Sequence, residues 1–375
     1  MHKSFIFSIL IILSLCGNSQ YSIIDVLERL DSLQVDQNDF YDSGLFPCQR
    51  SWSFSNNPVE DNTIFFSASI AFTLREIYPL LDSGAQLIAH QIIAGVGRNY
   101  QKYRSRKSEA TFNFWQTIAP DLPFPNGGRL ISNEGMRLPD DYDTSCLIAL
   151  AAGNDSVSLN LRKAMVEYAN RANRNENEPT TLNEYKDSQA YEVWYAKEMP
   201  QTFDICVMSN ALLFVVKNGF ELNGTDSATF ELIQQMIRND DHLTNTKFIS
   251  HHATSPALIL YHVSRLIKAD SLGILNDLNR IVIEDLLQLL DESENEMEKV
   301  LILTSLFRLG HSISEAPNFD ELSKDLQSFI FFSVKPFGSG FSSLRLDGIS
   351  PTIDWYCEAY NWALVLEYLV LSEAN

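Results

Sequence analysis

Apolar residues recur every three to four positions along most of the chain, whereas the alternation of apolar and polar residues typical of strands is scarce. This periodicity predicts about twelve helices, many of them joined by short junctions rich in Gly, Asn or Asp. We therefore expect an all-α protein. The predicted helices span residues 22–35, 62–79, 83–104, 142–153, 156–172, 203–218, 225–239, 254–269, 276–292, 296–310, 320–334 and 353–372.

The predicted helices alternate between two kinds. One kind is apolar on nearly every side, as expected of a helix that is buried all round, while its partners carry more charge, as in residues 231–238. Six buried helices alternating with six amphipathic ones predict an (α/α)6 toroid, in which an outer ring surrounds an inner one. The apolar segments are residues 64–74, 146–152, 205–216, 257–267, 300–309 and 362–371.

Long irregular stretches separate some of these helices. No low-complexity tract or long linker divides the chain, so residues 20–375 are expected to form a single domain. In a toroid the long stretches would fold over the mouth of the central cavity, and loops of such length usually have a function. They comprise residues 36–60, 105–141, 173–202, 241–253 and 335–352.

Several predicted inner helices begin at or near an acidic residue: Asp61, Asp143, Asp204 and Asp354. Helix capping explains any one of them, because an Asp side chain accepts hydrogen bonds from the free amides of a first turn. The inner helices of a toroid run parallel, however, so their amino ends converge. We therefore expect these carboxylates to line one mouth of the cavity.

The chain is acidic, with 28 Lys and Arg against 48 Asp and Glu and a formal net charge of −20. Its 45% content of hydrophobic residues is that of a globular protein, and 375 residues can bury a large core. The acid excess excludes a general nucleic-acid binder, which needs clustered Lys and Arg. It also argues against docking on anionic lipid headgroups.

The amino-terminal residues are typical of a secretory signal peptide. A short basic start precedes an apolar run at residues 5–15, which is too short to span a bilayer, and small residues follow at 17–19. We expect cleavage after residue 19 and a secreted or periplasmic mature protein. The alternative, a lipoprotein anchored through Cys16, is disfavoured by Leu15. No later segment predicts a transmembrane anchor.

The mature chain would retain Cys48, Cys146, Cys206 and Cys357. No Cys-x-x-Cys pair occurs, so their spacing does not indicate a zinc site. Export would permit disulfide bonds, whose pairing the sequence leaves open. Cys146 and Cys206 lie inside apolar helical stretches, which favours buried free thiols.

The densest polar cluster consists of Asp140, Asp141 and Asp143, at the start of the predicted helix 142–153. Carboxylates so close together repel one another unless a cation, a proton or a helix start compensates. Asp143 fits a helix cap, whereas Asp140 and Asp141 precede it. The cluster could hold Mg²⁺ or Ca²⁺, could keep one carboxyl protonated as a general acid, or could be a solvated acidic loop.

Residues 138–145, Leu-Pro-Asp-Asp-Tyr-Asp-Thr-Ser, open a predicted inner helix of this helical-hairpin chain. The combination resembles the terpenoid cyclase and protein prenyltransferase superfamily of toroids, squalene-hopene cyclases included. In the class II cyclases an Asp-x-Asp-Asp-Thr motif supplies the acid that protonates an isoprenoid. Asp141-Tyr142-Asp143-Thr144 matches that motif with one aspartate missing. The resemblance implies that Asp143 is the proton donor and Asp141 its neighbour.

Other polar residues are predicted to line the same cavity. Tyr142 stands within the motif, and Asn210 lies among apolar residues of a predicted inner helix. A buried Asn needs a hydrogen-bond partner, which a ligand or a neighbouring helix could supply. His251 and His252 precede the next inner helix, and one of them could act as a base or proton shuttle at the mouth.

The last predicted helix begins with a mixture of acids and aromatic residues. Asp354 and Glu358 are four residues apart, so they would share one helix face, which we expect to face the cavity because unpaired polar groups are unfavourable in a core. Trp355, like Trp115 and Trp194, adds aromatic surface. Such surface beside carboxylates suits sugars, through ring stacking, or carbocations, through cation–π attraction.

Three functions stay open. No dinucleotide-binding, P-loop, nucleophile-elbow or His-Glu-x-x-His motif occurs. The resemblance implies a cyclase-like enzyme in which Asp143 starts a cation cascade. Export favours a carbohydrate enzyme with two carboxylates as acid and base, one from Asp141 or Asp143 and one from Asp204 or Asp354. A non-catalytic module would keep the toroid and bind a small molecule or a glycan.

Overall fold

The computed structural model describes residues 21–36, 40–53, 57–106, 108–117, 140–171, 181–195, 201–252, 255–334 and 352–375. This part of the chain is mostly helical, as predicted, and also contains a small antiparallel sheet. The predicted signal peptide and Cys16 lie outside the described residues. Within those residues, no helix combines the length and the apolar character that crossing a bilayer requires.

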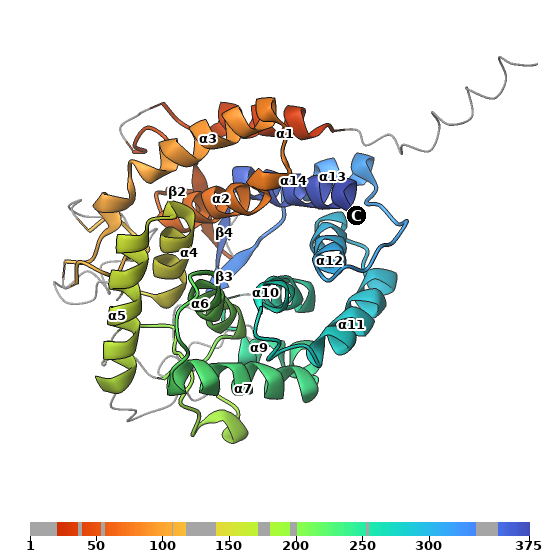
Figure 1. The fold of residues 1–375 in the computed structure, drawn as a ribbon. Helices are drawn as coiled ribbons and strands as arrows, with labels where there is room; N and C mark the ends of the chain where they lie inside the picture. Colours follow the sequence, from red (N-terminus) through yellow and green to blue (C-terminus); the bar gives the residue numbers. More distant parts are fainter. Residues whose placement is uncertain are drawn as a thin grey trace, which may run out of the picture.

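Six helices contact one another in cyclic order (Figure 1). Each packs against the next one along the chain, and the last of them, α14, packs against the first, α2. Most of their side chains are buried, which agrees with their predicted apolar character. They are α2 (Ile64–Ile77), α4 (Tyr142–Ala152), α6 (Ile205–Lys217), α10 (Pro256–Ala269), α12 (Glu296–Arg308) and α14 (Glu358–Ala374).

A second set of helices packs around these six (Figure 1). Helix α1 packs against α14, α3 against α2, α5 against α4, α7 against α6, α11 against α10 and α13 against α12. Their bounds are α1 (Ile23–Leu33), α3 (Ser83–Gly97), α5 (Asp155–Arg171), α7 (Gly224–Arg238), α11 (Leu278–Glu292) and α13 (Phe319–Asp325), with the short α8 (Asp241–Thr244) and α9 (Thr246–Ile249) following α7.

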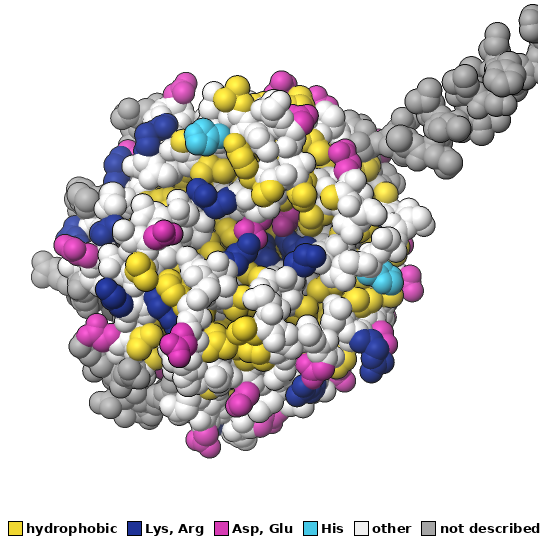
Figure 2. Space-filling view, viewed as in Figure 1, with side chains coloured by type: hydrophobic (Ala, Val, Ile, Leu, Met, Phe, Trp, Pro, Cys, Tyr) yellow, Lys and Arg dark blue, Asp and Glu magenta, His cyan; other side chains and the backbone are white. Residues whose placement is uncertain are grey.

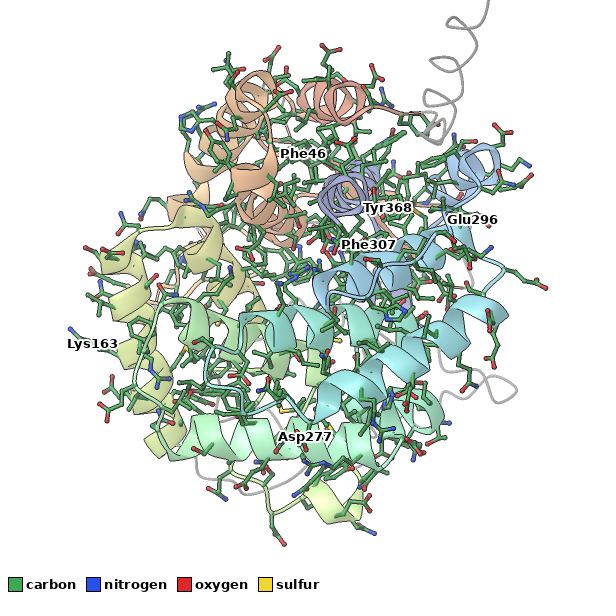
Figure 3. All side chains as sticks on the ribbon, turned by 45° about the vertical axis from the view of Figure 1, so that its right-hand side comes forward. Phe46, Lys163, Asp277, Glu296, Phe307 and Tyr368 are labelled. Atoms are coloured by element: carbon green, nitrogen blue, oxygen red, sulfur yellow. The ribbon has the colours of Figure 1, made fainter. Side chains whose placement is uncertain are left out.

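Helix caps and packing explain where these helices begin and which faces they bury. Thr63, Asp141 and Asp204 each accept a hydrogen bond from a first-turn amide, at the starts of α2, α4 and α6 respectively. Inside the molecule, the rings of Phe307 on α12 and Tyr368 on α14 have centroids 6.0 Å apart, whereas Lys163 projects outward from α5 (Figure 3).

Four short strands form a sheet beside the amino ends of α2 and α14. Strand β2 leads into α2 and strand β4 leads into α14, so the sheet joins segments from the two halves of the chain. All neighbouring strands are antiparallel, in the order β2-β1-β4-β3. Their bounds are β1 (Cys48–Trp52), β2 (Val59–Asp61), β3 (Phe332–Val334) and β4 (Ile353–Tyr356).

The sheet corrects two predicted helix boundaries. The helix predicted at 320–334 ends at Asp325, and the helix predicted at 353–372 begins only at Glu358. The residues left over form β3 and β4, which pair with each other, and β4 pairs with the distant β1. Periodicity within such short runs does not reveal pairing between distant segments. The helix predicted at 83–104 also ends early, at Gly97.

Four cysteines lie within the described residues. Cys48, Cys146, Cys206 and Cys357 are all buried and none forms a disulfide bond. The prediction of buried free thiols at Cys146 and Cys206 is therefore confirmed. Burial raises the pKa of the Cys357 thiol to about 12, so this group stays protonated and unreactive near neutral pH.

Candidate functional site

The amino ends of α4, α6 and α10 lie together, because α4 and α6 are linked by the hydrogen bond between Asn210 and Asp143, and α6 and the segment before α10 by the hydrogen bond from the amide of His251 to Asp204. Asp141 and Asp143 stand at the start of α4, Asp204 caps α6, and His252 precedes α10. The loop at 191–195 joins this group, because the backbones of Asp141 and Trp194 form a β-bridge. We call Asp141, Asp143, Asp204, Asn210 and His252 the mouth cluster.

Asp204 is fully buried and accepts several hydrogen bonds. Its Oδ1 accepts from the amide of Cys206 at 2.9 Å, and its Oδ2 accepts from the amide of His251 at 2.8 Å and lies 3.1 Å from Nδ1 of His252. Burial alone would raise the pKa of Asp204, but the hydrogen bond and charge of His252 hold it well below its ordinary value. Burial would lower the pKa of His252, but the Asp204 carboxylate raises it. The two groups therefore favour an ion pair.

Asp143 has the opposite character. It is partly exposed at the mouth, and its Oδ1 accepts a hydrogen bond of 2.6 Å from Nδ2 of Asn210. Burial raises the pKa of Asp143 to about 7, the Asn210 hydrogen bond opposes that rise, and the charges of Asp141 and Asp204 add to it. Asp143 can therefore carry a proton near neutral pH. The partner that Asn210 needs is supplied by a neighbouring helix.

Asp141 adds a second carboxyl with a raised pKa. Its Oδ1 caps α4 by accepting a hydrogen bond of 2.6 Å from the amide of Thr144. Its Oδ2 is enclosed and has no hydrogen-bond partner among the described residues. Burial raises the pKa of Asp141 to about 6, although the hydrogen bonds with Thr144 lower it. The charge of Asp141 also raises the pKa of Asp143, so ionisation of Asp141 favours the protonated form of Asp143.

The three clustered aspartates face different partners. Asp140 lies apart from the other two, with hydrogen bonds from Oγ1 of Thr111 at 2.8 Å and from Nδ2 of Asn113 at 3.5 Å. Within the described ranges, no group of three or more His, Cys, Asp or Glu side chains is placed to hold a metal ion. Asp140, Asp141 and Asp143 thus have different hydrogen-bond partners, and a Mg²⁺ or Ca²⁺ site at these residues stays a prediction.

Two aromatic rings border the mouth cluster. The ring of His252 stacks on Phe332 of β3, with centroids 5.2 Å apart and an angle of 10°, and Trp194 meets it edge-on at 6.4 Å. His252, Phe332 and Trp194 are all partly exposed. Tyr142, which was predicted to line the cavity, is buried elsewhere and stacks on Tyr195 at 3.8 Å.

Asp61 forms a clasp within the sheet. Its carboxylate accepts hydrogen bonds from Nη1 of Arg50 at 2.9 Å, Nε1 of Trp115 at 2.7 Å and Nε1 of Trp355 at 2.9 Å. All four side chains are buried. Both oxygens of Asp61 are thus used in joining β1, β2, β4 and the segment 111–115. The indole N–H groups of Trp115 and Trp355 thus both donate to the carboxylate of Asp61, and these polar groups satisfy one another.

The start of α14 differs from its prediction. Asp354 lies in strand β4, where it accepts hydrogen bonds from Thr352 at 2.9 Å and from Ser333. Because α14 begins only at Glu358, the two acids do not share a helix face. Glu358 pairs instead with Arg29 of α1, at 2.6 Å and in contact with solvent. The structure does not bring Glu358 into the mouth cluster.

Some residues of the mouth had no signal in the sequence. Phe332 falls in a run predicted to be helical, and its position against His252 depends on the pairing of β3 with β4. Arg50 is a single basic residue in a stretch predicted to be irregular, and only the sheet brings it to Asp61.

Two comparisons with known proteins give no match. No protein-family model matches the chain. A search of curated proteins also finds no match. The geometry of the mouth cluster is therefore the basis for any statement about function.

Proposed function

We propose that the twelve longer helices form an (α/α)6 toroid. In this arrangement α2, α4, α6, α10, α12 and α14 are the inner ring, and α1, α3, α5, α7, α11 and α13 are the outer one. The cyclic contacts of the first set and the pairing of each of its members with an outer helix support the proposal. The mouth cluster would then stand where the amino ends of the inner helices converge.

We propose further that the mouth cluster is the active site of an acid–base enzyme. The observation that carries this proposal is that the pKa values of two neighbouring carboxyl groups are shifted in opposite directions. The pKa of Asp143 rises to about 7, whereas the pKa of Asp204 is held low by His252. Environments that raise the pKa of one acid and lower that of its neighbour are typical of a general acid beside an ionised partner. Asp143 would donate the proton. The Asp204–His252 ion pair would place fixed charges beside it.

The best-supported substrate class is a neutral carbohydrate. Asn113, Asp140 and Asp143 offer partly exposed hydrogen-bonding groups of the kind that bind hydroxyls, and the rings of Trp194 and Phe332 offer stacking surface. The local excess of carboxylates repels anionic substrates and favours neutral ones. Export from the cytoplasm, which the signal-like start of the chain supports, would place the enzyme where polysaccharides are found.

A cyclase-like reaction on an isoprenoid is the second candidate. It is supported by the ability of Asp143 to carry a proton and by its place in the motif at the start of α4. A cation cascade, however, is best served by apolar and aromatic walls around the acid. Asp143 has Asp141, Asp204 and His252 as neighbours, which are ionisable and not apolar. We therefore prefer a carbohydrate substrate to an isoprenoid.

The test is a comparison of turnover in matched variants. The full-length chain would be incubated with neutral oligosaccharides and, separately, with linear isoprenoids, and products would be identified by mass spectrometry. Asp143→Asn should reduce turnover about 100-fold or more, because the amide cannot donate the acid proton. Asp291→Asn, at an exposed position of α11, is the control and should retain full activity.

Each result separates the candidates. Release of new reducing ends supports the carbohydrate enzyme, and cyclised hydrocarbon supports the cyclase. Full activity of Asp143→Asn would contradict the assignment of Asp143 as the acid. Binding of a glycan at the mouth without any turnover would favour the non-catalytic module.

A further inference from the structure

A buried arginine without an ion pair lies near the carboxyl end of α10. Only 6% of the surface of Arg265 is exposed. Its Nε and Nη2 atoms are enclosed and have no hydrogen-bond partner, and its guanidinium pairs with no carboxylate in the described part of the chain. A buried charge with unused N–H groups is strongly unfavourable unless something compensates it.

Aromatic rings provide part of that compensation. The guanidinium carbon of Arg265 lies 5.0 Å from the ring centroid of Phe72 on α2 and 4.7 Å from that of Tyr261 on α10. A second cation, Arg308 of α12, lies 4.3 Å from the same Tyr261 ring. Cation–π attraction stabilises the charge. It provides no acceptor in the plane of the guanidinium, where the N–H groups point.

The nearby carboxylates are already paired. Glu367 of α14 binds Arg308 and accepts a hydrogen bond of 2.6 Å from the Tyr261 hydroxyl. Glu76 forms an ion pair with Lys217 at 2.7 Å. Burial disfavours the charged form of Arg265, yet the negative charges of Glu367 and Glu76 raise its pKa, so the side chain stays cationic. Arg265 is therefore a surplus positive charge in this group.

The view in Figure 2 is consistent with a charged centre at one end of the ring. Lys, Arg, Asp and Glu side chains gather in the middle of the face in view, where the six helices of the ring surround the centre in Figure 1. The last turns of α2, α6, α10 and α12 each carry a basic residue. An anion that approaches this face meets a positive environment.

We propose that Arg265 is the centre of a binding site for a small monovalent anion of halide size. The anion would accept hydrogen bonds from the guanidinium and neutralise the surplus charge. A single negative charge suffices, because Arg308 and Lys217 already have partners. The small size follows from the burial of Arg265, and the site is separate from the mouth cluster and independent of the enzymatic proposal.

Chlorine NMR of the full-length chain tests the site directly. In a chloride-free gluconate buffer to which chloride is added, the protein should broaden the chloride line, and bromide should reverse the broadening by competition. Arg265→Met should weaken this binding by about tenfold or more, as expected for loss of a charge-assisted hydrogen bond. Lys163→Met, which removes an exposed cation on α5 away from this face, is the control and should bind as the parent does.

Two results would overturn the proposal: no protein-dependent broadening, or equal broadening in the parent and in Arg265→Met. If Arg265→Met does not fold, anomalous diffraction from crystals of the parent protein soaked in bromide tests the site instead. An anomalous peak within hydrogen-bond distance of the Arg265 guanidinium is expected. Peaks confined to the outer surface would show that water alone solvates this side chain.

Discussion

The raised pKa of Asp143 can be tested without knowing a substrate. The unfolded chain should release this proton with the ordinary pKa of 3.8, whereas burial raises the value in the folded protein to about 7. The folded state therefore binds the proton more tightly. Asp143 therefore contributes its full stabilisation at a pH below its pKa in the unfolded chain. This stabilisation is lost as the pH rises through its pKa in the folded protein.

The size of the effect follows from the shift. A change of about three units corresponds to about 4 kcal/mol in the free energy of unfolding between about pH 4 and pH 8. Because Asp143 is partly exposed, solvent screening reduces this figure, and we expect a loss of about 2 kcal/mol or more. In Asp143→Asn the side chain cannot titrate. The variant should therefore gain at least that much relative to the parent as the pH rises.

Urea unfolding followed by circular dichroism at about pH 4, 6 and 8 measures the difference. Asp291→Asn, at an exposed position of α11, serves as the control, and its difference from the parent should stay constant. A constant difference for Asp143→Asn as well would refute the reasoning. It would mean that folding does not raise the pKa of Asp143, so that the group is ionised near neutral pH and cannot serve as an acid there.

Three further predictions concern neighbouring groups. Asn210→Leu removes a hydrogen bond that lowers the pKa of Asp143 and should raise that pKa by about one unit, measured by carbon NMR of the carboxyl; no change would show that the bond is weak in solution. Asp204→Asn should destabilise the protein by about 3 kcal/mol at neutral pH, because it leaves His252 without its partner. Since the pKa of Asp204 is lowered, this loss should shrink below about pH 4 in urea unfolding, and a pH-independent loss would contradict the ion pair. Asp61→Asn should cost about 3 kcal/mol in the same assay, because a buried guanidinium loses its carboxylate; a loss below about 1 kcal/mol would show that the clasp is not structural.

The periodicity of the sequence predicted the helices well because each follows from local information. An inner helix such as α6 is apolar on every side, and its capping residue Asp204 stands directly before it. The acidic starts also indicated where a polar site would form. Asp141, Asp143 and Asp204 stand at the starts of α4 and α6, and Nδ1 of His252 lies 3.1 Å from the carboxylate of Asp204. The start of a helix and the polar residues that stand there can thus be predicted from neighbouring positions in the sequence.

Tertiary structure decided which of these residues share an environment. Asp61 and Asp143 looked alike as acids at helix starts, yet Asp61 is bound by Arg50 and two indoles, whereas Asp143 accepts a hydrogen bond from the neutral amide of Asn210. Strand pairing across some three hundred positions places Trp355 beside Asp61 and changes the start of α14. Such contacts depend on burial and long-range packing, which determine whether a carboxyl is ionised. The sequence by itself determined the helices and the acids at their starts, and only the packed chain determined which acid keeps its proton.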